Sequence, residues 1–178
     1  MMIKDLYEKA RTTKSDINEH IPFLYRLANT CNRVTEFGTG HGVSTSSFLY
    51  ARPTRFVSYD IVRHPEVNGL LEAAKAEDVN FEFRMKNILQ LVIEPTDLLF
   101  IDDKHAYAHV KLELLMHAPL VEKYIAFHDT ETFGFRGEDN DPIGIWPAVA
   151  EFLREQPQWR LLQHYANNNG LTVLMKVG

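Results

Sequence analysis

The residues whose types and spacing suggest chemistry lie where short apolar runs end. The first run, residues 34–37, is followed by glycines at positions 38, 40 and 42 and then by a predicted helix at 43–49. Glycine permits the positive φ angles of a tight turn and lets a ligand approach the main chain closely. A strand, a glycine turn and a helix in this order predict the entry unit of a nucleotide-binding α/β sheet.

Polar side chains also end the later apolar runs. Asp60 lies 20 residues after the second glycine, where a carboxylate can accept hydrogen bonds from both hydroxyls of a ribose. Asn87 ends the next run, the string Asp-Asp-Lys-His at 102–105 ends a third, and His128 and Asp129 end a fourth. These groups are candidates for cofactor contacts, acid–base catalysis or metal ligation. Asp60 could equally cap the following helix, and Asn87 could have a purely structural role.

The elements that must position these residues alternate between strands and helices. Strands are predicted at 34–37, 55–61, 80–85, 97–102, 124–128, 159–165 and 171–177. Helices are predicted at 3–11, 43–49, 65–77, 106–120 and 145–155, with a helical turn at 88–92. A further helix, the second in the chain, is predicted to begin with Ser15 or Asp16 as its N-cap. This alternation predicts a parallel sheet with helices on both faces, which binds ligands beyond the carboxyl ends of its strands. The Asn-Asn-Asn-Gly turn at 167–170 predicts that the last two strands form an antiparallel hairpin.

The spacing of the glycines separates two classes of nucleotide site. A dinucleotide fingerprint, G-x-G-x-x-G, would need its third glycine at position 43, which is Val43. The chain instead has E-x-G-x-G-x-G, beginning at Glu36, which resembles the first motif of the class I S-adenosylmethionine (SAM) methyltransferases. In that family the turn wraps the methionine half of the cofactor. The resemblance implies a Rossmann-like, seven-stranded α/β methyltransferase sheet, mostly parallel with an antiparallel C-terminal hairpin, and helices on both faces.

Two further strings, FIDDKHAYAHV and IAFHDTETF, narrow the resemblance. They are similar to the macrocin O-methyltransferase-like and cephalosporin-hydroxylase-like branch (methyltransferase domain family 24), whose fourth strand usually ends I-D-G-D-H-x-Y. The resemblance covers most of the chain and places the branch's first acid at Asp102, its histidine at His105 and its fifth-strand acid at Asp129. Asp103 replaces a common glycine and Lys104 a frequent second aspartate. If that aspartate is the base in relatives, His105 is the remaining acid–base candidate.

The motifs and the resemblance together give three sets of predicted site residues. Cofactor contacts are expected at Glu36, Gly38, Thr39, Gly40, Gly42, Asp60, Ile61, Asn87 and Asp102. Catalysis is expected to involve His105 and Asp102, and a divalent cation is expected at Asp102, His128 and Asp129. A mixed oxygen and nitrogen donor set favours manganese, iron or zinc over magnesium. The competing interpretation is that His128, which stands where metal-dependent relatives have an acid, only hydrogen-bonds a neighbouring strand end.

Composition limits the classes of partner. The 178 residues carry a net charge of −5 and no basic run, which argues against nucleic acid and anionic lipid as partners. A single cysteine, Cys31, and the charged N-terminal segment lead us to expect a cytoplasmic protein without a signal peptide. We expect one SAM-dependent methyltransferase domain over residues 1–178, with N-terminal helices in 1–30 and no separate cap domain. A small-molecule acceptor is the expected partner, and a homo-oligomer remains open.

The expected function is SAM-dependent methyl transfer to an oxygen of a small molecule, with or without help from a divalent cation. The alternatives are a non-catalytic SAM-binding or interaction protein of the same fold and an NAD(P)-dependent oxidoreductase. Of the remaining histidines, His41 could either contribute only its backbone or cover the cofactor with its ring. The loop at 130–142 could be a lid over the substrate, with Phe133 and Phe135 as its aromatic residues, or an irregular surface segment. The other histidines are expected at the surface or in helix packing: His20, His64, His109, His117 and His164.

Overall fold

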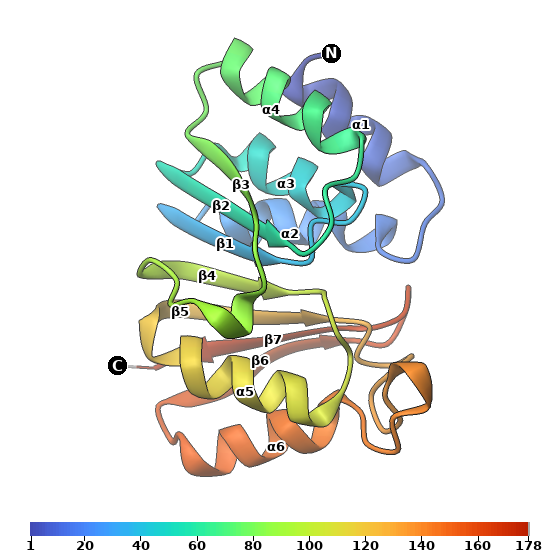
Figure 1. Cartoon of the computed structure of the whole chain (residues 1–178), viewed down its shortest axis with the longest axis vertical. Helices are drawn as coiled ribbons and strands as arrows, with labels where there is room; N and C mark the ends of the chain where they lie inside the picture. Colours follow the sequence, from blue (N-terminus) through green and yellow to red (C-terminus); the bar gives the residue numbers. More distant parts are fainter. Residues whose placement is uncertain (178) are drawn as a thin grey trace.

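The computed structural model describes residues 1–177, and its centre is a seven-stranded sheet with strand order β3-β2-β1-β4-β5-β7-β6 (Figure 1). β5 pairs with β7 in the antiparallel direction, as does β6, and the remaining neighbours are parallel. The predicted fold class, including the C-terminal hairpin, is therefore confirmed. The strands are β1 Arg33–Phe37, β2 Arg55–Asp60, β3 Phe81–Met85, β4 Thr96–Ile101, β5 Val121–His128, β6 Trp159–Tyr165 and β7 Leu171–Lys176.

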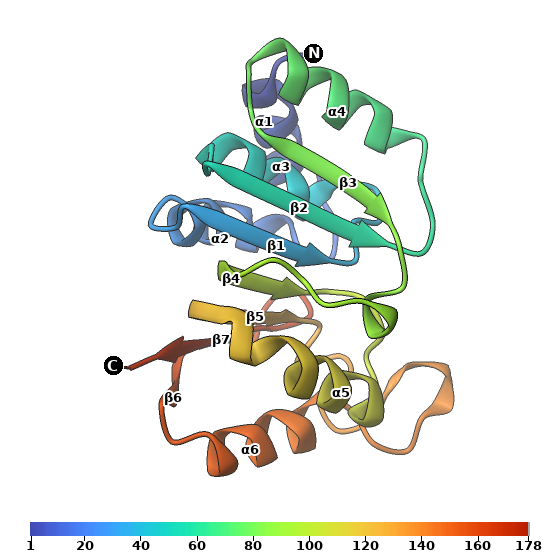
Figure 2. The same cartoon turned by 60° about the vertical axis from the view of Figure 1, so that its left-hand side comes forward.

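Helices cover both faces of the sheet and form two separate apolar cores. α1 Ile3–Thr12, α2 Ile21–Ala28, α3 Val43–Ala51 and α4 Glu66–Ala76 pack together on one face. α5 Tyr107–His117 and α6 Ile145–Glu155 lie on the other, as the two views show (Figures 1 and 2). Short 3₁₀ turns are η1 Asn18–His20, η2 Ile88–Gln90, η3 Ala118–Leu120 and η4 Glu138–Asn140. Among residues 1–177, no helix has the length and apolar character needed to cross a membrane.

Two predicted boundaries differ from the structure for local reasons. The second helix begins at Ile21 with Pro22 in its first turn, where a missing N–H costs no hydrogen bond. The segment before it forms η1 in place of the predicted helix start at Ser15 or Asp16. α5 ends at His117, and β5 already begins at Val121, earlier than predicted, because Val121 is fully buried against the core under α5.

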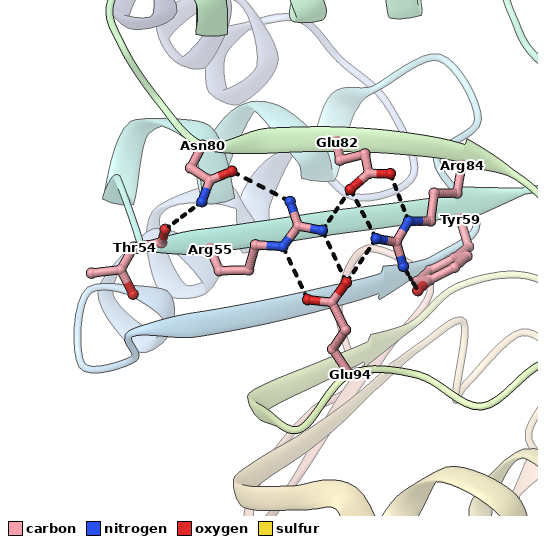
Figure 3. A network of polar contacts seen from close by, with 7 residues as sticks. All are labelled: Thr54, Arg55, Tyr59, Asn80, Glu82, Arg84 and Glu94. Carbon is pink, nitrogen blue, oxygen red and sulfur yellow. Dashed lines mark hydrogen bonds and ion pairs between the residues drawn. The ribbon is translucent and has the colours of Figure 1, made fainter.

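A network of four charged side chains covers part of the sheet at β2 and β3 (Figure 3). Arg55 donates hydrogen bonds to both Glu82 and Glu94. Arg84 donates to the same two carboxylates, and also to the hydroxyl of Tyr59 at 2.9 Å. The side chains are about a quarter to half exposed. In this arginine–glutamate network (Arg55, Glu82, Arg84 and Glu94), each charge therefore has opposite charges on two sides.

Candidate active site at the strand ends

The glycine turn after β1 is shaped by three positive φ angles, 82° at Gly38, 48° at Gly40 and 79° at Gly42. A Cβ on Gly38 would lie 1.9 Å from the backbone oxygen of Asp102, and one on Gly42 would lie 2.4 Å from Leu70 Cδ1. A Cβ on Gly40 would meet no atom of the described protein within 4 Å. Packing within the fold thus requires Gly38 and Gly42, whereas Gly40 leaves its outer side open.

Glu36 lies beneath this turn and is fully buried. Its carboxylate accepts hydrogen bonds from the hydroxyls of Ser44 at 2.6 Å, Thr45 at 2.8 Å and Ser58 at 2.6 Å. Burial raises the pKa of Glu36 to about 7, although the three hydroxyls act in the opposite direction. The side chain therefore links β1, the start of α3 and β2, and so fixes the turn from below.

A cavity of about 820 Å³ lies above the carboxyl ends of the strands. Its wall includes the glycine turn, the ends of β2, β3, β4 and β5, and residues 16–17 before η1. Asp60 belongs to this wall and accepts hydrogen bonds from the N–H of Gly40 at 2.8 Å and of Val62 at 2.9 Å. Asn87 belongs to it as well, and its side-chain oxygen accepts from the N–H of Leu89. Both polar groups are thus held in place by main-chain donors.

The structure brings most of the predicted cofactor residues together around this cavity. Those that line it are Gly38, Thr39, Gly40, Asp60, Ile61, Asn87 and Asp102. Glu36 and Gly42 do not line it. The carboxylate of Glu36 hydrogen-bonds Ser44 beneath the turn, and Gly42 packs against Leu70 behind it. His41 lies at the rim, 65% exposed, with its ring 4.4 Å from that of His64.

His105 is the centre of a buried group that we call the strand-end cluster (Asp102, His105, His128, Asp129 and Glu138). Its Nε2 lies 3.4 Å from oxygens of both Asp102 and Asp129, and its Nδ1 lies 3.3 Å from Glu138. Burial lowers the pKa of His105, but the surrounding carboxylates outweigh it and raise that pKa to about 9. Burial likewise opposes ionisation of Asp102, yet the neighbouring imidazoles of His105 and His128 hold its pKa below the ordinary range. His105 therefore carries its proton at neutral pH.

The predicted cation ligands Asp102, His128 and Asp129 offer donor atoms within 4.8 Å of one another. His128 is fully buried, with Nδ1 3.2 Å from Asp102 and Nε2 3.3 Å from the backbone oxygen of Asn168. A carbonyl at the second ring nitrogen is the usual arrangement for a histidine that ligates a metal. Asp129 has φ 58° and a buried Oδ1 that makes no hydrogen bond within the described residues. The donor set therefore fits a divalent cation.

The loop at 130–142 reaches the cluster from one side. Phe133 stacks on the ring of His105, with centroids 5.0 Å apart, whereas Phe135 is 78% exposed. Glu138, in η4 of the same loop, supplies the third carboxylate around His105. The sequence allows either a lid or an irregular surface segment here and gives no signal for Glu138, because nothing in an irregular loop indicates which acid turns inward.

His109 was predicted to be a surface or helix-packing residue, and the structure adds contacts that this prediction did not include. It lies on α5 at the cavity wall, with Nε2 3.1 Å from Asp103 and 3.7 Å from Glu113. A signal was present in the sequence, since Asp103 stands where the resembling branch has glycine and Glu113 falls one helical turn after His109. His20 and His117 are buried, as expected for packing residues.

No family model matches the sequence, and no curated protein sequence matches it significantly. Solved structures do match it in fold. An O-methyltransferase of tomaymycin synthesis from Streptomyces achromogenes, in complex with SAM, has a TM-score of 0.68 and 16% identity, covering 99% of this chain and 89% of that chain. An O-methyltransferase from Bacillus cereus in complex with S-adenosylhomocysteine (SAH) has a TM-score of 0.68 and 14% identity, covering 98% and 90%.

A third similar structure is the 1,6-didemethyltoxoflavin-N1-methyltransferase from Burkholderia thailandensis, with bound 1,6-didemethyltoxoflavin and SAH. It has a TM-score of 0.69 and 16% identity, covering 99% of this chain and 87% of that chain. These similarities show that the chain has the fold of these proteins over nearly its whole length.

Proposed function

We propose that this protein binds SAM in the strand-end cavity and transfers its methyl group to an oxygen of a small molecule. The observation that carries the proposal is the open side of Gly40, which lines the cavity beside Asp60 and offers a place where a ligand can approach the main chain. Proteins of the same fold that were solved with SAM or SAH support it.

The residues around the cavity divide naturally between the parts of the cofactor. Gly38, Thr39 and Gly40 would face the methionine half, and Asp60 would accept the ribose hydroxyls. Ile61 and Asn87, at the ends of β2 and β3, would lie along the adenine. Asp102 would face the sulfonium end, from which the methyl group leaves. Glu36 and Gly42 would act only through the shape of the turn.

Methyl transfer is an in-line attack on the sulfonium methyl carbon, so the protein's main task is to position the acceptor and the cofactor. A hydroxyl acceptor must also lose its proton. The raised pKa of His105 favours its protonated form at neutral pH, which would donate a hydrogen bond to the acceptor, with Asp102 as the positioning residue beside it. Asp129 lines the cavity and has an oxygen free of hydrogen bonds within residues 1–177, which suits it to receive the proton.

A divalent cation held by Asp102, His128 and Asp129 would add Lewis-acid stabilisation of the deprotonated acceptor oxygen. His128 would then ligate through Nδ1 while Nε2–H donates to the backbone oxygen of Asn168. Without a cation, His128 would still hydrogen-bond Asp102 and lie 3.5 Å from Asp129, as it does within the described chain. Chelation followed by readdition of manganese, zinc or magnesium separates the two modes.

The test of the proposed function is a thermal-shift panel of SAH, NAD and NADP on the full chain. A ligand bound only by the native state stabilises it, by about 2.7 kcal/mol at 100 times its dissociation constant. SAH should raise the melting temperature and the nicotinamide cofactors should not. A shift with NAD or NADP alone would instead identify an oxidoreductase. Binding of SAH without transfer from labelled SAM to any hydroxyl acceptor would point to the non-catalytic alternative.

A further inference from the structure

Three side chains beside the cavity, which we call the α5 cluster, take no part in the proposed methyl transfer. Asp103 follows the end of β4, and His109 and Glu113 lie one turn apart on α5. One ligand atom from each lies within 4.8 Å of the other two. Asp103 and His109 line the cavity, and Glu113 lies behind them.

Glu113 is the unusual member of this cluster. Its side chain has 0% exposure, and neither carboxylate oxygen makes a hydrogen bond with any described residue. Oδ1 of Asp103 is also buried without a hydrogen-bond partner. Leaving a buried carboxylate unpartnered is costly, because the charge has lost its hydration and gained nothing in return. Two carboxylates around one imidazole therefore need either a proton or a cation between them.

The donor atoms favour a particular class of cation. Two carboxylate oxygens and one imidazole nitrogen form a mixed set that suits zinc, manganese or iron better than magnesium or calcium. Three protein ligands with a fourth position open is the arrangement of catalytic rather than structural zinc sites. Here the open side is the cavity, since the two ligands nearest to it, Asp103 and His109, form part of its wall.

We propose that Asp103, His109 and Glu113 form a second metal site, of the zinc class, that opens onto the strand-end cavity. It is distinct from the set of Asp102, His128 and Asp129, because the two adjacent aspartates contact different histidines. A cation there would neutralise the two carboxylates and present an open coordination position to whatever occupies this side of the cavity. The proposal does not depend on the identity of the cofactor.

The competing account is that Glu113 simply keeps a proton. Burial, and then the charge of Asp103, raise the pKa of Glu113 well above its ordinary value. A protonated Glu113 would make the cluster neutral enough to remain buried without any ion. The two accounts differ in one measurable property, which is whether the native protein binds zinc through these side chains.

The experiment is calorimetric titration of the chelator-treated full chain with zinc chloride, without cofactor. Glu113→Gln and His109→Ala should each weaken the binding of one zinc ion per chain by at least tenfold. Glu72→Gln, which removes a carboxylate from the exposed side of α4, should leave that equivalent unchanged. In urea titrations, Glu113→Gln should unfold at a midpoint no lower than that of the wild type. The substitution removes the repulsion between two buried carboxylates and breaks no hydrogen bond with a described residue.

Two other groups could bind zinc and are controlled separately. His64→Ala removes a ligand from the exposed group of His41, His64 and Glu66, and Asp129→Asn removes one from the strand-end cluster. The zinc ion whose binding is weakened in Glu113→Gln and His109→Ala should still bind normally to His64→Ala and to Asp129→Asn. If zinc binding is the same in Glu113→Gln and His109→Ala as in the wild type, the proposal is overturned and the protonated form remains. SAH binding, measured on the same samples, reports separately on the proposed function.

Discussion

Two groups of charged side chains, which lie on different strands of the sheet, differ in how their charges are paired. The arginine–glutamate network on β2 and β3 has two cations and two anions, and every one of them donates or accepts at least two hydrogen bonds (Figure 3). At the carboxyl ends of β4 and β5, five carboxylates and three histidines lie together instead, and several buried oxygens have no hydrogen bond within residues 1–177.

The pKa values in the two groups indicate that the first has a structural role and that the second is suited to binding and catalysis. In the network, hydrogen bonds from Arg84 lower the pKa of Glu82 to about 2, and those from Arg55 lower the pKa of Glu94 to about 2, so both carboxylates stay ionised. At the strand ends the pKa values of His105, Asp129 and Glu113 all lie above their ordinary values. Displaced pKa values, here together with unpartnered carboxylate oxygens beside a cavity, are characteristic of sites that bind and react. In the arginine–glutamate network, by contrast, the charged groups already hydrogen-bond one another, so we expect no ligand to bind there.

Of the two regions, the strand-end cluster should show the larger change in stability and in histidine titration when one charge is removed. The pKa of His105 is raised, so its stabilising contribution is fully present below about pH 6.5 and lost as the pH rises through about 9. In chelator-treated wild-type protein, the free energy of unfolding should therefore decrease between these values, by on the order of 2 kcal/mol. Asp102→Asn should lower the pKa of His105 by at least about 1 unit, equivalent to about 1.4 kcal/mol, and flatten this dependence.

Urea unfolding across this pH range and NMR titration of the His105 ring protons measure the two quantities. Arg84→Met serves as the control, since it removes a charge from the other region and should leave the His105 titration unchanged. An Asp102→Asn protein whose His105 titrates as in the wild type would show that the cluster is not coupled in the way described.

Breaking the arginine–glutamate network should have a smaller effect, and only on stability. Arg84→Met leaves Glu82 and Glu94 with Arg55 as the one cation that they contact within residues 1–177. Pairs this exposed contribute little, so we expect a loss of about 1 kcal/mol or less, corresponding to about 2–4 °C in melting temperature for a chain of this size. The loss should shrink in 1 M salt, where such charges are screened.

Differential scanning calorimetry at low and high salt measures this loss, and Arg154→Met is the matched control. Arg154 is 71% exposed and pairs only with its neighbour Glu155 among the described residues, so its removal should change nothing measurable. If Arg84→Met weakened SAH binding by more than about threefold, the division between a structural network and a binding end would be wrong.

Much of the fold could be predicted from the sequence because its signals are local. The glycines at 38, 40 and 42, the alternating apolar segments and the Asn-Asn-Asn-Gly turn each predict an element without knowledge of the rest. Residues at strand ends were predicted to converge because parallel strands end at one edge of a sheet, and most of the predicted cofactor residues do line the cavity.

The parts that could not be predicted depend on which way a side chain points. Glu36 belongs to the glycine motif, yet its carboxylate turns down to three hydroxyls from α3 and β2. Glu138 reaches His105 across an irregular loop, and His109 turns to Asp103 rather than to solvent. The four residues of the arginine–glutamate network come from three separate segments, and nothing in their spacing indicates that they meet.

The claim that the open end of the sheet is a SAM site is tested most directly by calorimetry with SAH on the wild type and on Gly40→Val. A Cβ at this position would meet no atom of the described protein within 4 Å, and Gly40 lines the cavity, so a larger side chain is expected to take up space that the ligand needs. The positive φ adds strain of roughly 1–2 kcal/mol, so folding is checked by circular dichroism, with Gly69→Val on α4 as the control. The account predicts SAH binding that Gly40→Val weakens by at least 100-fold, about 2.7 kcal/mol, while Gly69→Val leaves it intact. A folded Gly40→Val protein that binds SAH as tightly as the wild type would contradict it.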